Sequence, residues 1–314
     1  MKIPQLNSND FLTLADFSRK EIFDLFEFSA KLKRDVKKGK FSKILENKTL
    51  AMIFEKNSTR TRVSFETGML QLGGHALFLS SSEIQLGRGE TIADTARVLS
   101  RYNDGIMIRT FGHDKVEELA KWADIPVING LSDSFHPCQA LADYFTIYER
   151  EKDITSIKLT YIGDGNNVAN SLLIGAAIIG CEIAIASPKG FEPEYSIVEK
   201  AYKIATQSNA KITITNNIDM AVDGADYLYT DVWVSMGQEK DSLKKRKAFA
   251  KYRIDNNLIK KTGKDAKVLH CLPAHRGEEI TDEVMDGPNS IVFDEAENRL
   301  HCQKAIMCAL MARK

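Results

Sequence analysis

The sequence lacks the features that would place the protein in a membrane or stabilise it with disulfides. No stretch approaches the roughly 20 uninterrupted apolar residues needed to cross a bilayer. The opening residues lack the apolar core of a signal peptide. The five cysteines are odd in number and include no C-x-x-C pair, which argues against a disulfide framework or a zinc site. We therefore expect a cytoplasmic protein with no metal.

The sequence also lacks an excess of charge of either sign. Lys plus Arg and Asp plus Glu both number 43, so the net charge is zero. Nucleic acid and anionic membrane surfaces bind clustered positive charge, and neither is expected as a partner. A length of 314 residues is long for one core and indicates two domains. We expect these at residues 1–150 and 151–314.

Short runs rich in Ile, Val and Leu recur along the chain, separated by segments of helical length. The expected strands are 50–54, 76–79, 105–109, 126–129, 158–162, 182–186, 211–215, 227–230, 267–270 and 291–293. Such apolar runs are typical of parallel strands covered on both faces. The pattern predicts an α/β protein with two doubly wound domains, each with a mainly parallel sheet, joined by long helices. A helix at 140–154 should join the halves, and a final helix at about 300–314 should pack back on the first domain.

Polar clusters follow these strands at their carboxyl ends. The clusters are residues 58–62, Gln85, Arg109 and 136–139 in the first half, and 164–167, 231–237, 270–273 and 294–299 in the second. Open parallel sheets bind ligands beyond the carboxyl ends of their strands. The clusters are therefore candidates for one crevice that takes two substrates.

Residues 58–62, Ser-Thr-Arg-Thr-Arg, form the most specific of these clusters. They lie where a strand passes into a helix expected at 59–72. A helix start offers unpaired N–H groups, hydroxyls add donors, and Arg60 adds a fork suited to phosphate oxygens. Arginines at a helix start oppose its dipole, which weakens the alternative of a plain capped helix. This segment predicts a phosphate site.

The other clusters are ambiguous by themselves. His136 and Gln139 suit an amide-shaped ligand, but a lone His before Pro is more often structural. The turn 163–168 lacks the third glycine of a dinucleotide fingerprint, which disfavours a nicotinamide dehydrogenase and leaves an Asn-capped turn or a small-ligand site. Asp231 begins a loop that suits an ammonium group or a surface turn. Cys271 is a candidate nucleophile, redox centre or hydrogen-bonding group. Residues 240–251 carry a run of charges and are expected to be an exposed, mobile or helical segment.

Taken together, four motifs resemble the ornithine branch of the aspartate/ornithine carbamoyltransferase family. They are Ser-Thr-Arg-Thr-Arg at 58–62, His-Pro-Cys-Gln at 136–139, Asp-Val-Trp with Ser-Met-Gly at 231–237, and His-Cys-Leu-Pro at 270–273. The resemblance covers nearly the whole chain. It implies transfer of the carbamoyl group from carbamoyl phosphate to the side-chain amine of L-ornithine, giving L-citrulline and phosphate in arginine metabolism, without a cofactor. It also implies a homotrimer with shared active sites.

The resemblance implies a role for each matching position. Carbamoyl phosphate is expected to contact Ser58, Thr59, Arg60, Thr61, Gln85, Arg109, His136, Gln139, Cys271, Leu272 and Arg299, with Gln85 supplied by a neighbouring subunit. Ornithine is expected to contact Asn167, Asp231, Ser235 and Met236. The catalytic residues would be Arg109, His136, Asp231 and Cys271, and the Leu272–Pro273 bond should be cis. The remaining alternatives are another amine acceptor, such as putrescine or an acylated ornithine, and a silent ligand-binding relative.

Overall fold

The computed structural model describes residues 2–234 and 242–312. The chain forms two compact units, one made of residues 1–145 and 297–314 and the other of residues 146–296. Helices α5 (Pro137–Tyr148) and α12 (Val292–Met311) each start in one unit and end in the other. Each unit contains a parallel sheet with helices, so the expected α/β class with two doubly wound units is confirmed.

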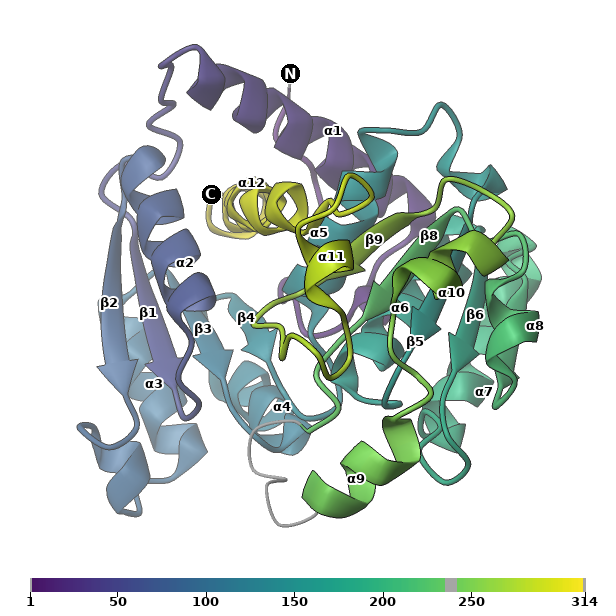
Figure 1. Ribbon diagram of the computed structural model, residues 1–314. Coiled ribbons are helices and arrows are strands. Elements are labelled where there is room, and N and C mark those ends of the chain that lie inside the picture. The colour runs from purple at the N-terminus through teal and green to yellow at the C-terminus, as the bar shows by residue number, and fades with distance from the viewer. Residues whose placement is uncertain (1, 235–241, 313–314) are drawn as a thin grey trace. The chain divides into compact units, whose positions relative to one another are not determined.

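The first unit is built on four parallel strands in the order β2-β1-β3-β4 (Figure 1). Their bounds are β1 Thr49–Phe54, β2 His75–Ser80, β3 Gly105–Arg109 and β4 Val127–Leu131. Helices α3 (Ile92–Tyr102) and α4 (His113–Trp122) cover the face that carries the side chains of Ile53, Ile106 and Val127. Helix α2 (Thr59–Gln71) lies on the other face (Figure 1). Strands β1, β3 and β4 are buried almost throughout, which explains why they read as continuous apolar runs, whereas the edge strand β2 is partly exposed.

Local signals begin and end the remaining helices of this unit. Helix α1 (Arg19–Lys37) starts with a capping box in which Ser18 and Glu21 bond each other's backbone N–H groups. Two short 3₁₀ turns, η1 (Leu14–Asp16) and η2 (Gln85–Arg88), lie in the connections. The end of α12 contacts α2, where a Cβ on Gly68 would lie 2.8 Å from Cε of Met307. Residues 297–312 thus belong to the first unit.

The second unit is built on five parallel strands in the order β7-β6-β5-β8-β9. Their bounds are β5 Lys158–Ile162, β6 Glu182–Ala186, β7 Ile212–Thr215, β8 Tyr227–Thr230 and β9 Lys267–His270. Helices α8 (Ile218–Val222), α10 (Asn256–Lys261) and α11 (Asp282–Met285) share one apolar core with the sheet. Helices α6 (Asn167–Ile179) and α7 (Tyr195–Ser208) lie on the opposite face (Figure 1). Helix α9 (Ser242–Phe249) and the 3₁₀ turn η3 (Ile154–Ser156) complete the unit.

The strand order of each sheet determines where a ligand can bind. In the first unit the chain passes from β1 to β2 on one side and returns through β3 on the other, so the order reverses between β1 and β3. In the second unit it reverses between β5 and β8. Loops at such a switch point diverge and leave a crevice at the carboxyl ends of the strands. The expected phosphate segment follows β1, and Asp231 follows β8.

Three expectations about elements are wrong. Residues 291–293 are not a strand, because Val292 already begins α12, and only the backbone of 289–291 bonds to Val268 of β9. Asp294 and Glu295 in the first turn of α12 favour a helix start there. The final helix therefore begins at Val292 rather than near residue 300, and the cluster 294–299 lies inside it. The joining helix α5 spans Pro137–Tyr148 and does not reach 154, where η3 begins.

Candidate active site

The start of α2 presents hydroxyl groups at the switch point of the first unit. The side chain of Ser58 caps the helix by accepting a hydrogen bond from the N–H of Thr61 at 3.2 Å. Thr61 is fully buried, and its Oγ1 accepts a hydrogen bond of 2.8 Å from Nη2 of Arg299. Thr59 is exposed, and Arg62 points away to pair with Glu66. The expected helix at 59–72 is thus confirmed, and only one of its two arginines belongs to the candidate site.

Three guanidinium groups surround His136 at this edge. Arg109 ends β3, Arg60 lies in the first turn of α2, and Arg299 comes from α12. His136 is 4 % exposed. Burial, followed by the charges of Arg299, Arg109 and Arg60, lowers the pKa of His136 well below 6.5. The imidazole is therefore neutral at pH 7 and can donate a hydrogen bond beside a concentrated positive charge.

Helix α5 carries the rest of the His-Pro-Cys-Gln motif. Nε2 of Gln139 donates to Oδ1 of Asp143, one turn further along, at 2.7 Å, and both residues are buried. The thiol of Cys138 donates to the carbonyl of Asn129 at 3.4 Å. Burial raises the pKa of Cys138 to about 12, so it stays protonated and is a packing residue rather than a nucleophile.

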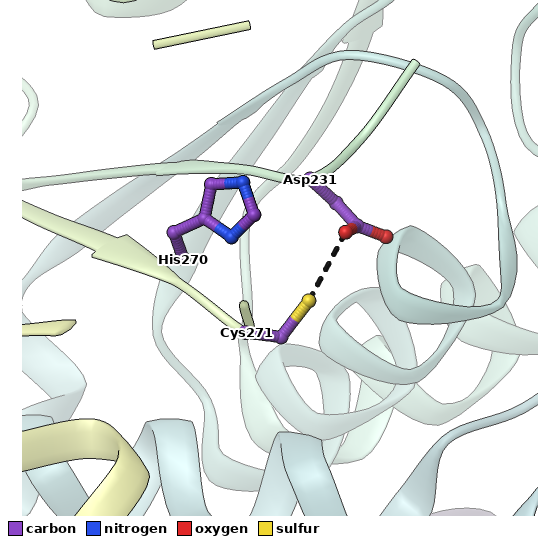
Figure 2. A group of neighbouring side chains, drawn as sticks. All are labelled: Asp231, His270 and Cys271. Atoms are coloured by element: carbon purple, nitrogen blue, oxygen red, sulfur yellow. Dashed lines mark hydrogen bonds between the residues drawn. The ribbon is translucent and has the colours of Figure 1, made fainter. Parts of the chain in front are cut away.

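In the second unit, Asp231 is the centre of a hydrogen-bonded group at the switch point. Figure 2 shows the thiol of Cys271 pointing at the Asp231 carboxylate, with Sγ 3.1 Å from Oδ1. The same oxygen accepts from the N–H of Val232 at 2.8 Å, and Oδ2 accepts from Nδ2 of Asn166 at 2.7 Å. Asp231 is 7 % exposed. These donors satisfy a buried carboxylate and fix its orientation.

The His270 ring does not bond to Asp231 but holds the backbone next to Cys271. Its Nδ1 accepts a hydrogen bond from the N–H of Leu272 at 2.9 Å, so the proton lies on Nε2, which donates to the carboxylate of Glu279 at 3.1 Å. His270 and Glu279 are both fully buried. Leu272 has a φ of 58°, and the Leu272–Pro273 bond is cis, as the resemblance implied. The two ring bonds thus hold the turn that places Cys271.

Two groups of side chains have the residue types and spacing of metal ligands. Asp231, His270 and Cys271 form one group, and His275, Glu278 and Glu279 form the other, with ligand atoms within 4.8 Å of one another. In both groups several of the potential ligand atoms already have partners. The ring nitrogens of His270 bond Leu272 and Glu279, while Glu278 pairs with Arg246 at 3.0 Å. Neither group gives grounds to propose a metal.

The structure thus gathers most of the predicted residues into two sets, one in each unit. Asn167 begins α6 beside Asn166, and Gln85 lies in η2 with its side chain exposed. Ser235 and Met236 lie outside the described residues. Sequence reasoning treated Asn166 only as a turn cap, although its amide also holds Asp231. Glu279 was missed altogether, because nothing in its local sequence shows that it meets a histidine nine residues earlier.

Of the charged segment 240–251, residues 240 and 241 lie outside the described residues, and the rest includes helix α9, in line with the helical alternative, but is not uniformly exposed. Lys245 of α9 is 7 % exposed, and its Nζ lies 2.5 Å from Oδ2 of Asp164. A run of charges predicts a solvated segment only when no buried partner is available, and the sequence could not show that Asp164 is one.

The fold and the two sets of residues define a two-unit α/β protein, with arginines around a histidine in one unit and a hydrogen-bonded carboxylate in the other. Family comparisons agree with this division. Residues 9–149 match the carbamoyl-P binding domain, and residues 155–310 match the Asp/Orn binding domain, of aspartate/ornithine carbamoyltransferases. The chain belongs to the aspartate/ornithine carbamoyltransferase family.

Individual relatives are similar over their full length. An ornithine carbamoyltransferase of Anoxybacillus flavithermus is 56% identical over 307 residues, which is 98% of each chain. The structure of the Pyrococcus furiosus ornithine carbamoyltransferase has a TM-score of 0.94 at 50% identity, covering 99% of both chains. The anabolic ornithine carbamoyltransferase of Campylobacter jejuni has a TM-score of 0.91 at 46% identity, covering 96% of this chain and 98% of that one.

Proposed function

We propose that the protein transfers the carbamoyl group of carbamoyl phosphate to the side-chain amine of L-ornithine, giving L-citrulline and phosphate. The observation that carries this proposal is the pairing of chemistries at the two switch points. One unit presents three arginines around a neutral histidine, and the other presents an oriented, buried carboxylate. The full-length relatives named ornithine carbamoyltransferase support the choice of substrates.

The phosphate of carbamoyl phosphate is assigned to the first unit. Ser58, Thr59, Arg60 and Thr61 offer hydroxyls, N–H groups and a guanidinium at the start of α2. Arg109 and Arg299 add two more positive charges, so a dianion gains more here than a neutral ligand does. The Arg299–Thr61 hydrogen bond supports a shared role for α2 and α12 in this set.

The carbonyl oxygen becomes negative as the amine attacks. Arg109 and His136 are the donors that stabilise this charge. The neutral imidazole of His136 donates a hydrogen bond to the oxygen and keeps its proton. Gln139 and the Cys271–Leu272 backbone complete the contacts to the carbamoyl group. The reaction is a direct acyl transfer without a covalent enzyme intermediate. We expect Arg60→Ala to lower turnover by at least about 10²-fold, and near-normal turnover would refute the phosphate assignment.

Ornithine is assigned to Asn167, Asp231, Ser235 and Met236. Its side-chain amine has a solution pKa near that of lysine, about 10.4, so it must lose a proton before it attacks. Asp231 and Cys271 are hydrogen-bonded to each other and orient this amine. The free amine then attacks the carbonyl carbon, the bond to the phosphate oxygen breaks, and phosphate leaves into the arginine set.

The direct test is citrulline formation from carbamoyl phosphate with four acceptors in parallel: ornithine, N-acetylornithine, putrescine and aspartate. Turnover with ornithine alone is the expected result. Turnover with another acceptor would keep the phosphate half of the proposal and overturn the ornithine half. Binding of carbamoyl phosphate without turnover of any acceptor would favour a silent relative.

We further propose a homotrimer in which Gln85 of one subunit reaches the phosphate bound by the next. Its exposed side chain supports this role. Mixed trimers test it: subunits with Arg60→Ala and subunits with Gln85→Glu should regain activity when mixed, because some sites then carry neither change. Mixing Arg60→Ala with His136→Ala subunits is the matched control. Arg60 and His136 of each site come from the same subunit, so every site lacks one of them and the mixture should regain no activity. A monomer by sedimentation would refute the assembly.

A cytoplasmic location and a role in arginine biosynthesis complete the proposal. The five cysteines all lie within the described residues and form no disulfide, and four of them are buried, as in proteins of a reducing compartment. Within residues 2–234 and 242–312, no helix combines the length and apolar character needed to cross a membrane. A deletion strain that needs citrulline or arginine for growth would support the biosynthetic direction, and unchanged growth without them would refute it.

A further inference from the structure

A buried ion pair links α9 to the turn after β5. Lys245 and Asp164 are each 7 % exposed, with Nζ 2.5 Å from Oδ2. Nζ also lies 5.7 Å from the ring centroid of Phe191. The neighbouring Lys244 and Lys247 on α9 are exposed. Lys245 is thus held apart from the charge run to which it belongs.

Stability alone gives little reason to keep this pair. Two charges lose their hydration when they are buried, and replacing a buried pair with apolar residues is often neutral or stabilising. Burial raises the pKa of Asp164, while the hydrogen bond and charge of Lys245 act against that shift. Because burying Lys245 and Asp164 costs desolvation free energy, the pair is better explained by the geometry that it imposes on α9 and the turn after β5.

The geometry leads to the candidate ornithine residues. Asp164 lies two residues before Asn166, whose Nδ2 holds Oδ2 of Asp231 at 2.7 Å. The backbone of this turn packs closely against residues 192–193, because a Cβ on Gly165 would lie only 2.2 Å from the backbone N of Pro193. The turn therefore has little room to shift. On the other side of the ion pair, α9 is the first described helix after β8 and Asp231 in the chain. The ion pair therefore joins the turn that carries Asn166 to the helix that follows Asp231.

We propose that the Lys245–Asp164 pair is a positioning device for the second substrate, holding α9 against the turn that carries Asn166 and Asn167. This inference rests on the proposed function, since the substrate positioned is ornithine. Neither side chain takes part in the chemistry. Loss of the pair should weaken ornithine binding and leave carbamoyl phosphate binding as it is.

Steady-state kinetics of four variants test the proposal: Lys245→Met, Lys245→Arg, Asp164→Asn and the double variant with Met and Asn. We expect each of the two neutralising single changes to raise the KM for ornithine about ten-fold, a common size of coupling between contacting residues. The KM for carbamoyl phosphate should stay unchanged. Lys245→Arg should keep most of the ornithine affinity. The double variant should be no worse than either single one, because both changes break the same bond.

Arg246→Met is the matched control, because it removes a neighbouring ion pair of α9, between Arg246 and Glu278. The Arg246 side chain is 49 % exposed, so this pair lies at the surface. The control variant should leave both KM values unchanged. An equal effect of Arg246→Met, an unchanged ornithine KM in Lys245→Met and Asp164→Asn, or a double variant that returns to the wild-type KM would overturn the positioning role. The last result would mean that only charge balance matters.

Two further results separate possible failures. If Lys245→Met does not fold, Asp164→Asn and Lys245→Arg still test the positioning role. Asp164→Asn keeps the size of the side chain, and Lys245→Arg keeps its charge. If the wild-type protein makes no citrulline from ornithine, the proposed function itself fails. If it does, and the variants match it, only the positioning role fails.

Discussion

Asn166 performs two separable tasks with the two ends of one amide, and two substitutions distinguish them. Its Oδ1 accepts hydrogen bonds from the N–H groups of Val168 at 2.9 Å and Ala169 at 3.1 Å, which caps α6. Its Nδ2 donates to Asp231 at 2.7 Å. Asn166→Ala removes both tasks. Asn166→Asp keeps the cap but places a second carboxylate where Asp231 has a donor.

The magnitudes follow from these contacts. Loss of the cap costs about 1 kcal/mol, and loss of a hydrogen bond to a charged group costs about 1.5–3 kcal/mol, so Asn166→Ala should lose about 3 kcal/mol. In Asn166→Asp the cap remains, but two carboxylates about 4 Å apart repel by roughly 4 kcal/mol at an effective dielectric constant of 20. Partial exposure of residue 166 makes that figure an upper bound.

The two variants also differ in their dependence on pH. Repulsion raises the folded-state pKa of the new carboxyl pair above the unfolded value of about 3.9. The penalty is then absent below the unfolded pKa, grows as the pH rises towards the folded pKa, and is fully present above it. Asn166→Asp should therefore lose more stability at pH 7.5 than at pH 5. The loss in Asn166→Ala should be nearly the same at both.

Urea unfolding at the two pH values, together with ornithine kinetics, measures both effects. We expect the KM for ornithine to rise in both variants, since Asp231 loses its orienting donor in each. An Asn166→Asp protein with wild-type ornithine KM and no extra loss of stability at pH 7.5 would refute the reasoning. It would mean that the amide does not hold Asp231.

Three further predictions concern other contacts. Burial lowers the pKa of Lys304 to about 8, so its penalty is fully present below pH 8 and disappears as the pH rises through the unfolded value. Lys304→Met should therefore gain up to roughly 3 kcal/mol in urea unfolding at pH 7, and this gain should shrink by pH 10. Gly165→Ala would place a Cβ 2.3 Å from the backbone carbon of Glu192, and we expect it to unfold at lower urea by about 3 kcal/mol; an unchanged midpoint would contradict the close approach. Cys271→Ala should lose roughly ten- to a hundred-fold more kcat/KM for ornithine than Cys271→Ser, which keeps a donor for Asp231; equal losses would argue against that hydrogen bond.

Local patterns in the sequence were enough to predict nine of the strands and the class of fold. Apolar runs such as 158–162 and 182–186 match β5 and β6 residue for residue, because buried parallel strands need continuous apolar side chains. Ser58 identified the start of α2 for a similar reason, since a helix cap is satisfied within three residues. The motifs also placed the candidate ligand-binding residues at the carboxyl ends of strands. The strand order within each sheet then creates one switch point in each unit, next to these residues.

Only the tertiary structure decided which of these side chains meet and which are buried. Thr61 and Arg299 are 238 positions apart and lie 2.8 Å from each other, while Lys245 and Asp164 are 81 positions apart. The run 291–293 was misread for the same kind of reason: its apolar residues suit a strand, yet the chain turns into α12 beside β9. Hydrogen bonds and charge pairs act over a few ångströms in space, whatever the separation in sequence, so their partners are known only once the sheets have brought them together.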